Sequence, residues 1–133
     1  MSTSGQLYII DRSRFLFRYV RSSNEFHFIK RNHVVYSYNP QGTYSTTLLT
    51  NDPSEAQKRL SLPNPPIYRV GGIPFKDLDP TIIKKRDIVA PAYGQPGRAE
   101  EILLDGPIPI FSIFDFNKGC TVYSFLKKMA SVV

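Results

Sequence analysis

The stretch that decides the fold runs from residue 90 to residue 105 and reads APAYGQPGRAEEILLD. Its first half is rich in proline and glycine, which favour turns and let another molecule approach the backbone closely. Its second half contains Ile102 to Leu104, a short apolar run that is typical of a buried strand. Glu100 and Glu101 stand at the junction between the two halves. We therefore expect a loop that leads directly into a central strand, with two carboxylates at the start of that strand.

These two glutamates are the first candidate functional residues. Successive side chains of a strand point to opposite faces, so only one of the two can enter a given cleft. Glu101 shares a face with Leu103, and Glu100 shares a face with Ile102 and Leu104. A glutamate pair is often only a solvated strand edge. Whether either residue has a chemical role therefore depends on which other functional residues the rest of the chain supplies.

Length and composition predict one folded domain spanning residues 1–133. The chain is 41% hydrophobic, and its 11 prolines and 8 glycines favour short strands joined by turns over a helix bundle. Asp52 as N-cap, Pro53 in the first turn and Glu55 predict one short helix over 53–62. We expect an α+β fold, with this helix and two small, twisted, mainly antiparallel sheets around a cleft.

Alternating or apolar segments predict the strands of these sheets. The segment RFLFRYV puts Arg18 on the same face as Leu16 and Val20. An isolated arginine of this kind is usually a salt-bridge partner or a surface group, but from a strand it can also present its fork to a phosphate. The predicted strands are 7–10, 14–20, 24–30, 32–38, 43–49, 67–70 ending at Gly71–Gly72, 102–104, 107–111 and 112–116, with a helical turn over 77–83 and a strand or helix over 121–133.

The composition also excludes several classes of protein. A single cysteine, Cys120, excludes an internal disulfide and a zinc site built from cysteines. His27 and His33 have no further ligand at metal-binding spacing, so we expect no metal. No apolar run has the length of a membrane span, and residues 1–11 show no signal-peptide pattern. The formal net charge of +6 suits a polyanion or a phosphate-bearing small molecule.

A hydroxyl-rich strand completes a set of three candidate elements. Tyr44 is followed by Ser45, Thr46 and Thr47. Threonine is ordinary in strands, but an aromatic residue followed by three hydroxyls can also support a bound ribose. Arg18, this strand and the glutamate pair occur in a fixed order along the chain.

That order resembles the ADP-ribosyltransferase superfamily of the R-S-E type. In that family an early strand carries the arginine, a middle strand carries a Ser-Thr-Ser motif, and the glutamate follows a substrate-recognition loop. Residues 94–101, GQPGRAEE, are similar to the G-Q-P-G-G-G-x-[EQ] stretch of bacterial polymorphic-toxin domains, including the necrotizing-toxin NAD glycohydrolases. The segments GTYSTT, SEAQKRLSLP and PPIYRV add to the likeness, which covers roughly 14–114.

The resemblance implies a toxin-like enzyme that cleaves the nicotinamide–ribose bond of NAD and transfers ADP-ribose to a macromolecular target or to water. It implies that Glu101, Arg18 and Ser45 are catalytic. It implies an effector that is secreted or delivered into the cytoplasm of a target cell, with a protein or nucleic-acid acceptor and a cognate immunity protein as partners, and no membrane role. The NAD-binding residues that it implies are Arg18, Tyr44, Ser45, Thr46, Thr47, Tyr93 and Gln95.

The chain departs from this pattern at two points. Arginine-directed transferases carry Gln or Glu two residues before the catalytic glutamate, whereas Ala99 precedes Glu101 at that spacing. Arg98 and Ala99 also replace two glycines of the toxin loop. We therefore do not expect transfer to arginine, and we expect a stiffer, more cationic loop.

The alternative is a nuclease toxin or an RNA-binding module. Residues 84–86, KKR, form a dense basic cluster, and the aromatic content of 13% supplies rings on which single-stranded RNA can stack. His27 or His33 with a glutamate would be the acid–base pair of a nuclease. A domain without enzymatic activity, in which the GQPG loop is only a surface turn, is the third hypothesis.

Overall fold

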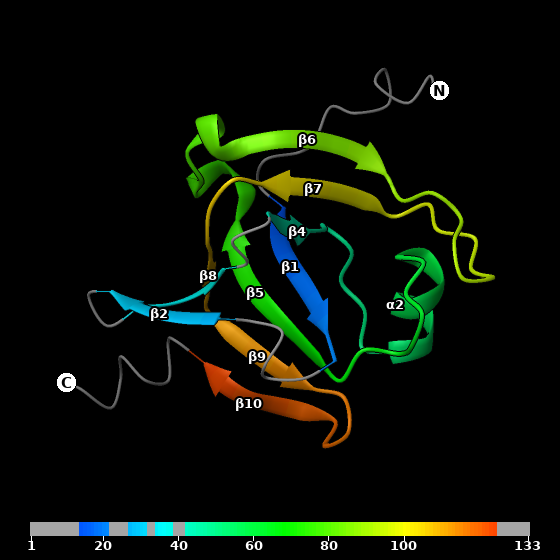
Figure 1. Cartoon of the computed structure of the whole chain (residues 1–133). Coiled ribbons are helices and arrows are strands. Elements are labelled where there is room, and N and C mark those ends of the chain that lie inside the picture. The colour runs from blue at the N-terminus through cyan, green and yellow to red at the C-terminus, as the bar shows by residue number, and fades with distance from the viewer. Residues whose placement is uncertain (1–13, 22–26, 32–33, 39–41, 125–133) are drawn as a thin grey trace.

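The protein is described by a computed structural model over residues 14–21, 27–31, 34–38 and 42–124, shown in Figure 1. The predicted strand over 7–10 and His33 lie outside the described residues. Of the predicted strand or helix over 121–133, only residues 121–124 are described. The elements in chain order are β1 (Phe15–Val20), β2 (His27–Arg31), β3 (Val34–Tyr38), β4 (Thr43–Ser45), α2 (Pro53–Arg59), β5 (Tyr68–Pro74), the 3-10 turns η2 (Phe75–Asp77) and η3 (Pro80–Ile82), β6 (Ile83–Ile88), β7 (Glu100–Leu104), β8 (Ile108–Ile110), β9 (Ser112–Asp115) and β10 (Cys120–Ser124).

The strands form three antiparallel sheets. Sheet A has the order β1-β5-β9-β10, sheet B has the order β2-β3-β8, and sheet C has the order β4-β7-β6. Figure 1 shows sheet C along one side of β1 and β5, with α2 at the end of these strands. The α+β class and the antiparallel sheets agree with the sequence-based prediction. Sheets A and C flank the cleft described below, and sheet B is an addition that the sequence did not predict.

The three sheets meet in one apolar cluster. Leu16 of β1, Ile102 and Leu104 of β7 and Ile108 of β8 are fully buried there. The face of β7 that carries Ile102 and Leu104 is therefore the core face. Burial of such aliphatic side chains stabilises the fold by roughly 1.5–3 kcal/mol each, and it fixes which way β7 is turned.

Helix α2 begins as predicted. The Asp52 carboxylate accepts a hydrogen bond from the Ser54 amide at 2.9 Å, and Pro53 occupies the first turn. The helix ends at Arg59, three residues before the predicted end, because the chain turns at Ser61, which has a positive φ of 50°. Ala56 of this helix is buried.

Two predicted strand ends are wrong, and one strand was not predicted. Strand β5 does not end at Gly71 but continues to Pro74, with a bulge opposite β1 at that point. A Cβ on Gly71 would lie 2.4 Å from the Leu16 carbonyl oxygen, so this glycine lets two strands approach closely. The basic cluster 84–86, for which no strand was predicted, lies in strand β6. Strand β4 stops at Ser45 because the hydroxyl of Thr46 accepts the Leu48 amide at 3.1 Å and turns the chain.

Candidate functional site

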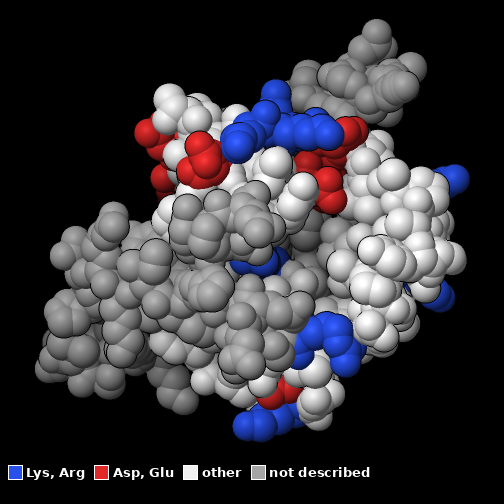
Figure 2. Space-filling model, viewed as in Figure 1, with Lys and Arg blue, Asp and Glu red and all other residues white. Residues whose placement is uncertain are grey.

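A cleft of about 90 Å³ lies where sheet A meets sheet C, and we call it the Glu101 cleft. Its location follows from one backbone contact: Phe17 of β1 and Thr46 exchange two hydrogen bonds of 2.9 Å, which tie the chain after β4 to sheet A. Figure 2 shows a recess near the middle of this face, beneath a band of Lys and Arg atoms. The lining residues are Phe17, Arg18, Tyr19, Tyr44, Ser45, Thr46, Leu60, Leu62 and Glu101.

Arg18 reaches the cleft from β1. Its face of the strand also carries Leu16 and Val20, which are buried, so the guanidinium is only partly accessible to solvent. Arg18 Nη1 donates a hydrogen bond to the Ser37 hydroxyl of β3 at 3.2 Å, and Ser37 is fully buried. This contact fixes the side chain beside the cleft, and a guanidinium can bind several acceptors at once.

Three consecutive residues reach the cleft from β4 and the turn after it. Ser45 is 3% exposed, and its hydroxyl donates to the Ile102 carbonyl of β7 at 3.1 Å. Thr46 is equally buried and uses its hydroxyl in the turn that ends the strand. Tyr44 is 54% exposed, so its ring stands at the mouth of the cleft. Both hydroxyls therefore hold the wall of the cleft through bonds to backbone.

Glu101 reaches the cleft from the second position of β7. Strand β6 runs beside it, with Asp87 as its cross-strand partner and Lys85 two residues away. Burial raises the pKa of the Glu101 carboxyl above its ordinary value; Lys85 counteracts this shift and Asp87 adds to it. A carboxyl with a shifted pKa in a cleft is a candidate for chemistry.

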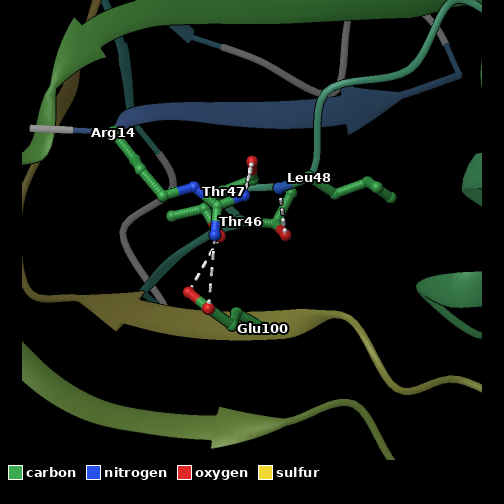
Figure 3. A network of polar contacts seen from close by, with 5 residues as sticks. All are labelled: Arg14, Thr46, Thr47, Leu48 and Glu100. Carbon is green, nitrogen blue, oxygen red and sulfur yellow. Dashed lines mark hydrogen bonds and ion pairs between the residues drawn. The ribbon is translucent and has the colours of Figure 1, made fainter. Parts of the chain in front are cut away.

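Glu100 lies on the opposite face of β7. Its carboxylate accepts a hydrogen bond from the Thr47 hydroxyl at 2.8 Å and lies 3.6 Å from Arg14 Nη1 (Figure 3). Arg14 also donates to the Thr47 carbonyl at 3.1 Å. These contacts join the start of β1 to β7, so the arrangement of Glu100 is that of a structural carboxylate. Thr47, to which the resemblance assigns NAD binding, belongs to this cluster and is not among the described lining residues of the Glu101 cleft.

Two further residues of the expected NAD site lie elsewhere. Tyr93 is 70% exposed and, with Gly94, forms a two-residue turn in which both φ angles are positive. Ala92 and Gln95 close this turn with hydrogen bonds of 3.1 and 2.8 Å. Neither Tyr93 nor Gln95, to which the resemblance assigns NAD binding, is among the described residues that line the Glu101 cleft.

The cleft also contains residues that the sequence analysis did not select. Phe17, Tyr19, Leu60 and Leu62 supply its apolar wall. Nothing in their local pattern separates them from core residues. Leu60 and Leu62 lie in the last turn of the predicted helix, and in the structure they follow the end of α2 and line the cleft together with Ser45.

A polar network behind the cleft holds the segment between β4 and α2. The Tyr19 hydroxyl donates to the Leu48 carbonyl at 2.7 Å and accepts from the Thr50 amide at 3.1 Å. Arg69 donates to the Thr50 carbonyl at 2.6 Å, and its guanidinium lies 4.7 Å from the centre of the Phe114 ring. Burial raises the pKa of Tyr19 and lowers that of Arg69.

Among the described residues, no group of three or more His, Cys, Asp or Glu side chains could hold a metal ion. None of the helices in the described part of the chain has the length and apolar character of a membrane-spanning segment. Comparisons of the chain with protein-family models, with curated proteins and with solved structures find no match.

Proposed function

We propose that the Glu101 cleft binds NAD and that the chain cleaves its nicotinamide–ribose bond, passing ADP-ribose to a macromolecular target or to water. One observation carries this proposal: Arg18, Tyr44, Ser45, Thr46 and Glu101, which come from three separate parts of the chain, line one cleft. A carboxylate, an arginine fork, an aromatic ring and backbone held by hydroxyls are the groups that such a reaction needs.

Glu101 would act on the charge that forms during bond cleavage. When the C–N bond breaks, its electron pair leaves with nicotinamide, and positive charge builds up on the ribose as in glycoside cleavage. A carboxylate stabilises this cationic state more than it stabilises the neutral ribose, which is the differential binding that catalysis requires. Water or an acceptor nucleophile then bonds to the ribose carbon and loses its proton.

The environment of Glu101 supports this role and predicts a pH dependence. Partial burial strengthens electrostatic interactions, because less water screens the carboxylate. The same burial raises the pKa of Glu101. Because the reaction needs the ionised form, turnover should fall as the pH decreases through this raised pKa.

The size of the cleft limits how NAD could bind. Pockets for drug-sized ligands enclose about 300 Å³ or more, whereas the Glu101 cleft encloses about 90 Å³. We therefore assign the nicotinamide end to the cleft, with Tyr44 at its mouth available for ring stacking. Arg18 would hold the phosphates through its fork, and the adenosine would lie outside the enclosed space.

Incubation of the purified chain with NAD tests the proposal directly. Released nicotinamide is measured by chromatography, with and without candidate protein and nucleic-acid acceptors. Release that needs no acceptor supports the hydrolase version, and release that needs an acceptor supports transfer. The absence of release under every condition would contradict both versions.

A second candidate function rests on a different surface. Lys84, Lys85 and Arg86 are all exposed on β6, the edge strand of sheet C, and Figure 2 shows basic atoms over this element. Such a row can contact the phosphate backbone of RNA. RNA binding that weakens steeply with salt, together with RNA cleavage that does not need NAD, would favour this alternative. His27, the described candidate for nuclease chemistry, belongs to β2 of sheet B and not to β6.

A further inference from the structure

The face of β7 opposite the Glu101 cleft borders a second cavity, of about 300 Å³, which we call the Arg98 cavity. Arginines from three parts of the chain line it: Arg14 before β1, Arg59 at the end of α2, and Arg98 in the loop before β7. Among the described residues, Glu100 is the one carboxylate in its lining. The formal charge of these four side chains is +2, so the cavity favours an anion.

The three arginines are not equivalent. Arg14 is engaged by Glu100 and by the Thr47 carbonyl. Within the described residues, no hydrogen bond or ion pair engages the side chain of Arg59 or of Arg98. A cation in the last turn of a helix interacts favourably with the helix dipole, which gives Arg59 an ordinary role. Arg98 does not belong to this helix, so the helix dipole does not explain its charge.

The backbone at Arg98 is held in an unfavourable conformation. Its φ is +84°, a value that costs a residue with a side chain energy that glycine avoids. Hydrogen bonds fix the conformation: the Arg98 amide donates to the Val89 carbonyl at 2.9 Å, and the Ala99 amide donates to the Arg59 carbonyl at 3.1 Å. The second of these bonds joins the backbone of the loop to the end of α2, and the two unengaged arginines line the same cavity. A strained residue held by its surroundings is a reason to look for a function there.

Thr47, Ala99 and two leucines complete the described wall of the cavity. Leu48 is buried, whereas Leu49 is 60% exposed and borders the same cavity. An exposed leucine beside two unengaged guanidinium groups suits a ligand with an anionic end and a flat or apolar end. Guanidinium forks match the oxygens of a phosphate group in geometry as well as in charge.

We propose that the Arg98 cavity binds a small phosphate monoester, with its phosphate on Arg59 and Arg98 and its apolar part against Leu48 and Leu49. This site goes beyond the proposed NAD chemistry and does not depend on it. The cavity lies on the Glu100 face of β7, whereas the Glu101 cleft lies on the other face.

Isothermal titration calorimetry with phenyl phosphate tests the site, because this probe contains a phosphate and a ring but is not a fragment of NAD. Inorganic phosphate should bind more weakly, and phenol should not bind measurably. Binding should strengthen as the pH rises through about 6, where the monoester takes up its second charge. The titration uses the full chain.

Two variants assign the binding to the cavity. Arg98→Gly removes the guanidinium but relieves the strained φ, so the melting temperature should be no lower than that of the wild type. Both this variant and Arg59→Gln should bind phenyl phosphate about ten-fold or more weakly, because each removes a charged hydrogen-bond donor. Lys118→Gln removes an exposed positive charge from the β9–β10 turn and should bind like the wild type.

Glu101→Gln separates this proposal from the NAD proposal. It should bind phenyl phosphate like the wild type, whatever its effect on NAD. The proposal is overturned if the wild type binds no phenyl phosphate, if Arg98→Gly binds as tightly as the wild type, or if Lys118→Gln weakens binding as much as Arg98→Gly does. Phenyl phosphate binding without any NAD cleavage would contradict only the NAD proposal.

Discussion

The hydroxyl of Thr47 donates a hydrogen bond to the Glu100 carboxylate at 2.8 Å, on the face of β7 that is turned away from the Glu101 cleft. Two adjacent glutamates therefore have different surroundings. Glu100 has a hydrogen-bond donor and an ion-pair partner in Arg14. Glu101 has a cleft in front of it and a raised pKa.

Glu100→Ala should lower the free energy of unfolding by about 1–2 kcal/mol, because it leaves the partly buried Thr47 hydroxyl without its acceptor. The ion pair with Arg14 adds little, since Arg14 is half exposed. Urea denaturation measures the change. Asp105→Ala removes an exposed carboxylate one residue after β7 and should change the value by less than about 0.5 kcal/mol. Equal effects of the two substitutions would contradict the structural role of Glu100.

Glu101→Gln should be at least as stable as the wild type at neutral pH. A folded-state pKa above the unfolded value means that the stabilising contribution of Glu101 is fully present below the unfolded pKa. It is lost as the pH rises through the folded pKa. The stability of the wild type relative to Glu101→Gln should therefore decline from acidic to neutral pH. Denaturation curves of both proteins across this range measure the trend, and a relative stability that rises with pH would contradict it.

Tyr19→Phe should destabilise the protein by about 1–3 kcal/mol, since it leaves the Leu48 carbonyl and the Thr50 amide without their shared partner. Thermal or chemical unfolding measures the loss. Tyr44→Phe is the matched control, because Tyr44 is 54% exposed and the change should have little effect on stability. If Tyr19→Phe is as stable as the control, the Tyr19 network does not hold the segment between β4 and α2.

Gly71→Ala should be much more damaging than Gly94→Ala. Both glycines have positive φ angles, so both substitutions carry a conformational cost of roughly 1 kcal/mol or more. A Cβ at position 71 would also lie 2.4 Å from the Leu16 carbonyl oxygen, whereas a Cβ at position 94 would meet no atom of the described residues within 4 Å. The difference between the two melting temperatures measures the clash. Equal melting temperatures would mean that β1 and β5 do not approach as closely as described.

Local sequence signals predicted the elements that depend on local chemistry. Asp52 and Pro53 gave the start of α2, and the alternation of side chains gave the opposite orientations of Glu100 and Glu101 in β7. Both features depend on residues adjacent in the chain, which is why a sequence without any structure reveals them.

Features that depend on long-range pairing were not predicted. Sheet B arises because β3 pairs with β8, with Val35 opposite Ile110, and no local pattern specifies a partner so distant in sequence. The wall residues Leu60 and Leu62 look like core residues until β4 is placed beside them. The resemblance assigns Tyr93 to NAD binding, but Tyr93 lies in a two-residue turn with Gly94 and does not line the cleft.

The most direct test of the central proposal is the rate of nicotinamide release from NAD by Glu101→Gln, measured beside Glu100→Gln and the wild type. We expect Glu101→Gln to lose activity on the order of a thousand-fold or more, because the group that stabilises the transition-state charge is gone. Glu100→Gln should lose about ten-fold at most, equivalent to about 1.4 kcal/mol, because it affects only positioning. An inactive Glu100→Gln beside an active Glu101→Gln would contradict the assignment of the catalytic residue, and full activity in both variants would contradict the NAD proposal itself.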